Sequence, residues 1–236
     1  MDAHELLGSR RTLSDIDFSD MDLGRLLRAD DEPYTFQRCT FDGSDLSGAD
    51  LRGASFIGCS LNHSVIRRAD LERTIWRGGT APFCDFTDAD VTDAEFDGMD
   101  LSNTCWRGTL LAATVFTGCR LVGARLQHSR GVGYGFSRCN LMLADLSGLS
   151  LRRRELVGLR MTEANLAGVD FTEATFTECQ LLGAELRAAT FTDADLRGAD
   201  LGKLSLRECV NLRGAFISVD QASGLLAGLG LRIMDG

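Results

Sequence analysis

The sequence places a large apolar side chain at every fifth residue over most of its length. Of the 35 positions that this period gives between Phe36 and Leu206, only Ala81 and Gly131 lack such a side chain. A helix repeats its apolar positions every 3.6 residues and a strand every second residue, so neither element fits this pattern. A period this long and this regular predicts a short unit that stacks on copies of itself.

A second position of each five-residue unit is also restricted. Two residues before most of the large apolar centres the chain carries a small side chain, most often alanine, and seven of the eight cysteines fall in this slot. The other three positions are mainly polar or charged. Each unit therefore buries only two of its five side chains, which is too few for it to be stable without neighbours.

These units resemble the pentapeptide-repeat family over roughly residues 34–216, and they contain Ala-Asp-Leu at 49–51, 69–71, 144–146, 194–196 and 199–201. The resemblance implies an all-β solenoid: a right-handed quadrilateral β-helix of about nine to ten coils, with four units per coil and a short C-terminal helix and strand as a cap. The sequence supports four units per coil independently, because eight of the ten centres found at every fourth unit are aromatic. These centres are Phe36, Phe56, Trp76, Phe96, Phe116, Phe136, Leu156, Phe176, Leu196 and Phe216. We predict that their side chains stack along one wall of the solenoid.

The two ends of the chain depart from the repeat. Residues 1–33 are expected to form an N-terminal partial coil and a loop, since Leu13, Phe18 and Leu23 keep the step of five in another phase. Residues 217–236 are expected to form a C-terminal capping and dimerisation module. Its helix begins with a capping box of Ser218 and Gln221, and residues 231–234 are predicted to finish it as a short strand. Such a cap covers the unpaired strand edge that ends any open β-solenoid.

Two places interrupt the period. Ala81 follows Gly78 and Gly79, and Gly131 opens the run Gly131-Val132-Gly133-Tyr134-Gly135. The second run superficially suggests a phosphate-binding loop, but no helix signal or Lys-Ser/Thr pair follows it. We interpret both places as distorted corners or small bulges, with a contact for a partner as the alternative.

The sequence offers little for an enzyme. The three histidines, at positions 4, 63 and 128, are scattered, and no Cys-x-x-Cys pair completes a metal site. We therefore predict no catalytic, metal-binding or cofactor-binding residues and no cofactor. The pairs Cys39/Cys59 and Cys119/Cys139 lie one coil apart, which a disulfide can span. Without a secretory signal we favour free thiols in a cytoplasmic protein, and no apolar run is long enough to cross a membrane.

Charge is the remaining signal for function. The formal net charge of −9 disfavours direct nucleic-acid binding. Residues 161–200 hold eight acids against Arg187 and Arg197, whereas residues 101–160 hold nine arginines against two acids. Aspartate most often precedes the apolar centre, so the period would set carboxylates at regular intervals, as phosphates are set along DNA. The simpler interpretation is a solvated surface with alternating bands of charge.

Within the family, residues 45–50, 56–59, 211–223 and 229–233 resemble the quinolone-resistance branch. The resemblance implies a non-enzymatic homodimer that mimics DNA, binds a type II topoisomerase, chiefly DNA gyrase, and modulates it or protects it from quinolone or toxin poisons. It also implies a dimer interface formed by Leu225, Leu226, Leu229, Leu231 and Ile233. The acids expected to face the enzyme are Asp90, Asp100, Asp170, Asp195 and Asp200. The alternative is a repeat scaffold that binds another protein through the arginine-rich band at 101–160.

Overall fold

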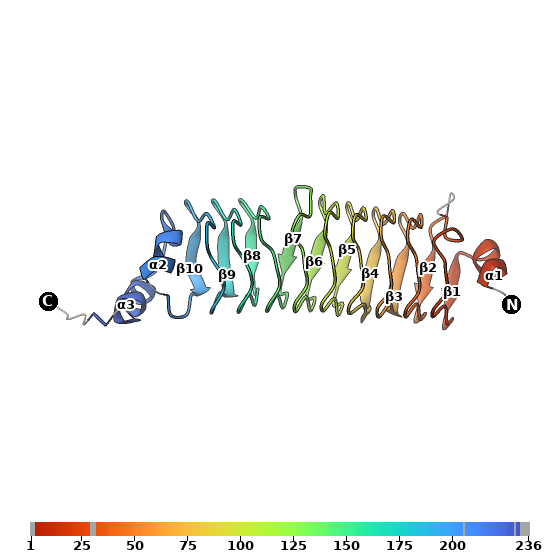
Figure 1. Cartoon of the computed structure of the whole chain (residues 1–236), viewed down its shortest axis with the longest axis horizontal. Helices are drawn as coiled ribbons and strands as arrows, with labels where there is room; N and C mark the ends of the chain where they lie inside the picture. Colours follow the sequence, from red (N-terminus) through yellow and green to blue (C-terminus); the bar gives the residue numbers. More distant parts are fainter. Residues whose placement is uncertain (1–2, 29–31, 205, 229, 232–236) are drawn as a thin grey trace.

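The structure is a computed structural model that describes residues 3–28, 32–204, 206–228 and 230–231. In this part of the chain ten short strands form one all-parallel sheet in sequence order (Figure 1). The strands are β1 (Thr12–Ser14), β2 (Thr35–Gln37), β3 (Ser55–Ser60), β4 (Ile75–Thr80), β5 (Glu95–Asp97), β6 (Val115–Thr117), β7 (Gly135–Ser137), β8 (Glu155–Val157), β9 (Thr175–Gln180) and β10 (Asp195–Asp200). The helices are α1 (Ala3–Ser9), α2 (Leu206–Cys209), the 3-10 helix η1 (Val210–Leu212) and α3 (Val219–Gly228).

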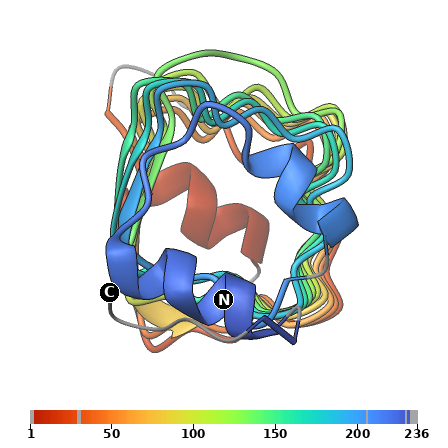
Figure 2. The ribbon, with the colours of Figure 1, turned by 90° about the vertical axis from the view of Figure 1, so that its left-hand side faces the viewer.

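The chain winds into a four-sided solenoid of about nine turns (Figure 2). Residues that are four units apart lie side by side in adjacent turns, as Phe56 and Trp76 do in β3 and β4. Isolated bridges such as Thr40 with Ser60 repeat this spacing on the remaining sides. The prediction of four units per coil is therefore confirmed.

We number the four walls by their first apolar centres in the regular repeat. Wall 1 begins at Phe36 and carries the sheet, wall 2 begins at Phe41, wall 3 at Leu46 and wall 4 at Leu51. Each later centre belongs to the same wall as the centre four units before it, because the bridges between turns keep that register.

The predicted aromatic column of wall 1 is present. The rings of Phe56 and Trp76 stack with their centroids 3.9 Å apart and their planes 6° apart, and Phe96 stacks on Phe116 in the same column. Wall 3 holds a shorter column in which Phe86 stacks on Trp106. The indole N–H of Trp76 donates to Thr74 Oγ1 at 2.9 Å, so its burial leaves no unpaired donor.

The prediction that Phe216 is the last member of the wall 1 column is wrong. Phe216 pairs with Asp195 rather than with the next residue, Leu196, which the period assigned to it. The regular units end near Leu204, and α2 and η1 then replace one side of the coil. This lengthens the turn, so Phe216 points outward with 56% of its surface exposed, while Ile217 packs partly against the core.

The small slot two residues before each centre lies inside the solenoid. Its alanines and most of its cysteines are buried. Each buried cysteine that lies between a wall 1 centre and the next wall 2 centre donates its thiol hydrogen to a backbone carbonyl one coil away. Cys59, for example, donates to Phe36 O at 3.5 Å. Cys209, which the period assigned to this slot, instead lies half-buried at the end of α2. The helix replaces the repeat at this point, so the slot does not exist there.

Residues 12–27 form a first coil that is shifted in register relative to the regular coils. Leu13 pairs with Phe36, because the segment that joins the first coil to the second is longer than a regular coil. Helix α1 was not predicted, and its Leu6 and Leu7 are buried at this end of the core. The Tyr34 hydroxyl donates to Leu7 O at 3.1 Å, so α1 is fixed over the first coil. The division of the chain at residues 33 and 216 stays a prediction.

The two interruptions of the period differ in structure. At Ala81 the bridges keep the register of the regular coils on both sides, so no bulge forms there, but the backbone is distorted at Gly79, whose φ is +90°. At Gly131 the chain does form a small exposed loop over residues 131–133, visible above β7 in Figure 1. The ring of Tyr134 turns into the core after this loop and takes the place of the missing apolar centre.

Candidate functional site

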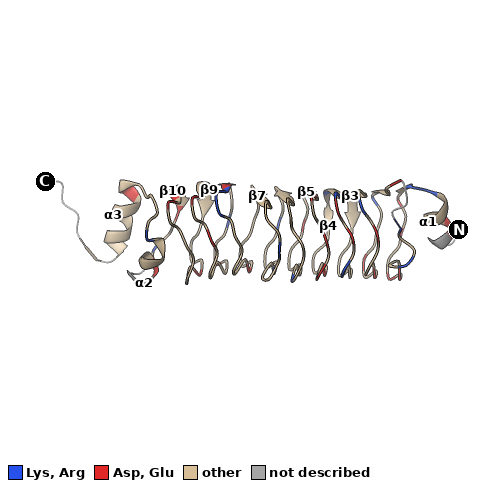
Figure 3. Cartoon of the chain, turned by 90° about the horizontal axis from the view of Figure 1, so that it is seen from above, with Lys and Arg blue, Asp and Glu red and all other residues tan. Residues whose placement is uncertain are grey.

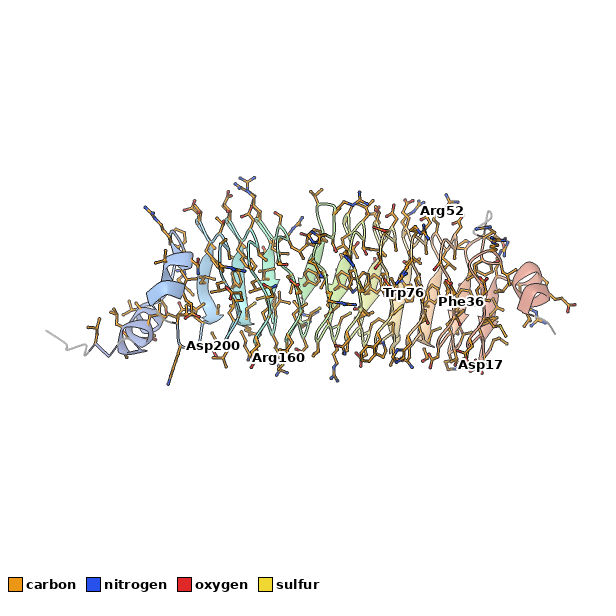
Figure 4. All side chains as sticks on the ribbon, viewed as in Figure 1. Asp17, Phe36, Arg52, Trp76, Arg160 and Asp200 are labelled. Atoms are coloured by element: carbon orange, nitrogen blue, oxygen red, sulfur yellow. The ribbon has the colours of Figure 1, made fainter. Side chains whose placement is uncertain are left out.

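The five aspartates predicted to face a partner lie on three walls. Asp90 and Asp170 precede centres of wall 4, Asp100 and Asp200 precede centres of wall 2, and Asp195 lies in β10 on wall 1. Figure 4 shows Asp200 and Arg160 along one edge of the rod, with Arg52 of wall 4 on the opposite edge. The structure does not bring these five residues together into one stripe.

Each of the five aspartates also has a local structural role. Its carboxylate accepts a hydrogen bond from the backbone N–H two residues later, as Asp90 does from Thr92 at 2.9 Å. The other four bonds come from the N–H groups of Ser102, Thr172, Arg197 and Gly202. This arrangement is an Asx turn, in which aspartate stabilises a change of chain direction. Forming the corners of the solenoid is thus one reason for aspartate before the centres, beside any partner.

The five carboxylates differ in their ion pairs and in the shifts of their pKa. Arg197 binds Asp195 at 2.7 Å and, with its backbone N–H, lowers the pKa of Asp195 to about 2. Burial acts to raise the pKa of Asp170, but the hydrogen bonds of Thr172 and the charge of Arg152 bring it below its ordinary value. Asp200 is exposed, and within the described residues it forms no ion pair. It is therefore the most available of the five to a partner.

Four further acids of the last coils were not singled out from the sequence. They are exposed and form no ion pair within the described part of the chain: Glu163, Glu178, Glu185 and Asp193. Three of them occupy the corner two residues after a centre. The excess of acids over residues 161–200 indicates an acidic surface in this part of the sequence. The prediction considered only aspartates directly before the centres, so it did not include the acids at the corners. Together with Asp200 they surround the C-terminal end of the solenoid.

A second acidic array lies on wall 4 in the N-terminal half. Asp50, Asp70 and Asp90 follow one another in adjacent coils. Arg52 binds Asp50 at 2.8 Å and reaches Asp70 at 3.5 Å. Burial raises the pKa of Asp70, and the charges of Asp50 and Asp90 raise it further. One arginine thus offsets part of the repulsion among three carboxylates.

The arginine-rich band at 101–160 does not form a single surface. The solenoid distributes its arginines over all four walls, with Arg107 and Arg125 on wall 3 and Arg120 and Arg160 on wall 2. On wall 4, Arg152 and Arg153 are both bound to Glu173, at 2.8 and 2.7 Å. A contact through the whole band would need a partner that surrounds the rod. Figure 3 shows basic and acidic residues interspersed along the coils.

Arg154 occupies a slot that normally points inward, and it lies near the Gly131 interruption. The hydroxyl of Tyr134 accepts a hydrogen bond from Ser150 N–H at 2.9 Å. Burial raises the pKa of the Tyr134 phenol, while the Ser150 bond and the positive charge of Arg154 oppose that shift. The half-buried Arg154 thus places its charge near a polar group at one of the two places where the apolar repeat fails.

The residues predicted to form a dimer interface lie at the C-terminal end. Leu225 is half-buried against the core, whereas Leu226 and Leu231 are 40% and 56% exposed. Leu229 and Ile233 lie outside the described residues. Helix α3 has no buried side chain in the monomer. Apolar side chains therefore remain uncovered here, and Val210, Phe216 and Val219 of the same C-terminal segment are exposed as well.

All eight cysteines are unpaired thiols. Within the described ranges, no three His, Cys, Asp or Glu side chains are grouped so that they could hold a metal ion. No described helix is long and apolar enough to cross a membrane.

The fold and its repeated unit define the class: a β-solenoid repeat protein with a charged outer surface and an uncovered apolar end. The model of the pentapeptide-repeat family matches eight copies, over residues 36–73, 66–105, 94–130, 155–193, 164–202 and 184–218. The chain belongs to the pentapeptide-repeat family.

Several solved structures are similar to this chain over nearly its whole length. A trypsin-treated variant of QnrB1, described as a plasmid-mediated fluoroquinolone resistance protein, is 28% identical with a TM-score of 0.70, and the match covers 95% of this chain and 100% of that chain. A second trypsin-treated QnrB1 variant is 26% identical with a TM-score of 0.64, covering 95% and 99%. No match was found among curated protein sequences.

Proposed function

We propose that this protein is a non-enzymatic DNA mimic that binds a type II topoisomerase, DNA gyrase above all, and modulates it or protects it from quinolone or toxin poisons. In this proposal it acts in the cytoplasm as a homodimer, needs no cofactor and does not bind nucleic acid itself. The similarity to QnrB1 along both chains supports the proposal, because that protein is described as conferring fluoroquinolone resistance.

One observation carries the proposal furthest: unpaired acids surround the same end of the rod that leaves apolar side chains uncovered. If two copies pair through α3, the acids Glu163, Glu178, Glu185, Asp193 and Asp200 of both copies lie on either side of the junction. The joined rods then present one long acidic region rather than two separate ones. Leu226 and Leu231 would be buried in the junction.

This region has the chemistry to replace DNA in a basic groove. Neighbouring coils lie about 4.8 Å apart, so the five acids of one copy fall within about two coil steps, on all four walls of the rod. Their number per length of rod is of the same order as that of phosphates in duplex DNA. Lysine and arginine that bind phosphate oxygens form charge-assisted hydrogen bonds with carboxylates as well. The backbone of the solenoid is already ordered, so it loses little conformational entropy on binding.

A supercoiling assay with purified gyrase, with and without a fluoroquinolone, tests the proposal. We expect micromolar protein to change supercoiling or the amount of trapped cleavage complex. The combined change Glu163→Gln, Glu178→Gln and Asp193→Asn should weaken this effect about tenfold or more. The matched control is Asp88→Asn with Asp93→Asn, which alters the same corner position far from the C-terminal end. No effect of the unaltered protein on either readout would refute the proposal.

The alternative function is that of a scaffold for another protein partner. The arginine band as a whole does not support it, since its members lie on four walls. Part of the band does support a narrower contact on wall 3.

A further inference from the structure

Wall 3 carries a groove of about 620 Å³ whose lining differs in charge from the rest of the protein. Four arginines line it, namely Arg67, Arg68, Arg107 and Arg125, against the two acids Asp85 and Asp88. The protein as a whole has a net charge of −9. The groove is therefore a local basic site on an acidic rod, and it is separate from the acidic C-terminal coils.

Most of the positive charge in this groove is available. Arg67 binds Asp85 at 2.7 Å, but over the described residues Arg68, Arg107 and Arg125 form no ion pair, and all three side chains are exposed. Guanidinium groups bind carboxylates and phosphates through paired N–H donors. The groove can thus accept an anionic ligand without first breaking an internal ion pair, except at Arg67.

A second observation indicates the chemical class of the ligand. Gln127 also lines the groove, and its side-chain oxygen is the only buried side-chain polar atom in the described part of the chain without a hydrogen-bond partner. Buried polar atoms are nearly always paired, so such an atom requires an explanation. It needs a donor. A phosphodiester, or a fully ionised phosphomonoester, has no donor on its phosphate, whereas a peptide brings backbone N–H groups together with its carboxylates.

The dimensions agree with a peptide. Arg67, Thr87, Arg107 and Gln127 occupy equivalent positions in successive coils, so the groove spans three coil steps, about 14 Å. At about 3.3 Å per residue this length holds four or five residues of an extended chain, whose alternate side chains point the same way. Two or three carboxylates of such a segment would face the arginines.

We infer that this groove binds an extended acidic segment of a partner protein, with its carboxylates on Arg107 and Arg125 and a backbone N–H on Gln127. A nucleic acid fits less well. Asp85 and Asp88 lie within the groove, and the Asp50, Asp70 and Asp90 array occupies the adjoining wall, so a long polyanion would be repelled. The inference does not depend on topoisomerase binding, because Arg125 and Gln127 lie almost two coils before Glu163, the first acid of the C-terminal region.

Fluorescence anisotropy with a labelled peptide of alternating Glu and Gly tests this inference. The same peptide with Gln in place of Glu, and a ten-base-pair DNA duplex, serve as competing probes. We expect the Glu peptide to bind more tightly than both and to weaken as salt rises from 50 to 300 mM. Arg107→Gln or Arg125→Gln should each weaken it about tenfold, and Gln127→Leu about threefold.

Arg187→Gln is the matched control, since Arg187 is exposed and holds the same position on wall 3 as Arg107, four coils further along. It should leave peptide binding unchanged. Equal binding of the Glu and Gln peptides, an equal loss with Arg187→Gln, or tighter binding of the duplex would each overturn the inference. The gyrase assay with Arg107→Gln keeps the two proposals distinct, because this variant should retain the full effect on gyrase.

Discussion

The side-chain amide of Gln221 donates to the backbone carbonyls of Leu196 and Ala199, both at 2.7 Å. These carbonyls lie on β10, the last strand of the solenoid, where no further coil follows to pair with them. The same side chain accepts from Ser218 N–H at 2.7 Å, and Ser218 Oγ accepts from Gln221 N–H at 3.1 Å. One glutamine thus begins α3 and covers part of the open strand edge.

Gln221→Glu is expected to lower the free energy of unfolding by about 2 kcal/mol, because it keeps the capping-box acceptor but replaces both donors to β10 with a carboxylate. Urea denaturation followed by circular dichroism measures this. Gln180→Glu, at an exposed position of β9, is the control and should change stability by less than about 0.5 kcal/mol. Equal effects of the two changes would mean that the Leu196 and Ala199 bonds contribute nothing to stability.

Trp76→Ala should lower the free energy of unfolding by about 4 kcal/mol, since it removes a buried ring from between Phe56 and Phe96 and leaves a cavity. Phe83→Ala offers a contrast, because Phe83 is about half exposed and stacks only on His63 at the surface. We expect a cost below about 1 kcal/mol there. Thermal unfolding of both variants measures the two losses. Equal losses would mean that the aromatic column does not contribute specially to stability.

Tyr134→Phe should cost about 1 kcal/mol at neutral pH, because it leaves the Ser150 N–H without its acceptor. The pKa of Tyr134 is raised by burial above its ordinary value of 10.0. A raised pKa of this group stabilises the fold below pH 10, and the stabilisation is lost as pH rises through the folded pKa. The deficit of Tyr134→Phe relative to the unaltered protein should therefore shrink above about pH 10. Denaturation curves at pH 8 and pH 11 measure it, and a constant deficit would contradict the assignment.

Leu226→Asp should convert the proposed dimer to a monomer, since it places a charge in an apolar junction. Light scattering on the purified protein gives the mass directly. Leu182→Asp is matched in exposure, 50% against 40%, but lies on the side of the rod. It should leave the mass unchanged. A Leu226→Asp protein with the same mass as the unaltered chain would rule out this junction.

Some of these features follow from the sequence alone. The five-residue period determines which side chains point inward, so the sequence alone places Phe56 beside Trp76. The capping box of Ser218 and Gln221 is a local pattern as well. Both depend on neighbours along the chain or on a strict repeat, and neither requires knowledge of how distant segments meet.

The tertiary structure decided the rest. Whether an acid is free or paired depends on the side chains that surround it. Glu173, which Arg152 and Arg153 bind, and the unpaired Asp193 occupy the same corner of wall 4 in adjacent coils, so their period cannot tell them apart. The groove on wall 3 exists because Arg67 and Arg107, which are distant in the sequence, occupy the same column. The outward turn of Phe216 depends on a helix that breaks the repeat. A period determines the direction of each side chain, but only the stacking of the coils determines what that side chain meets.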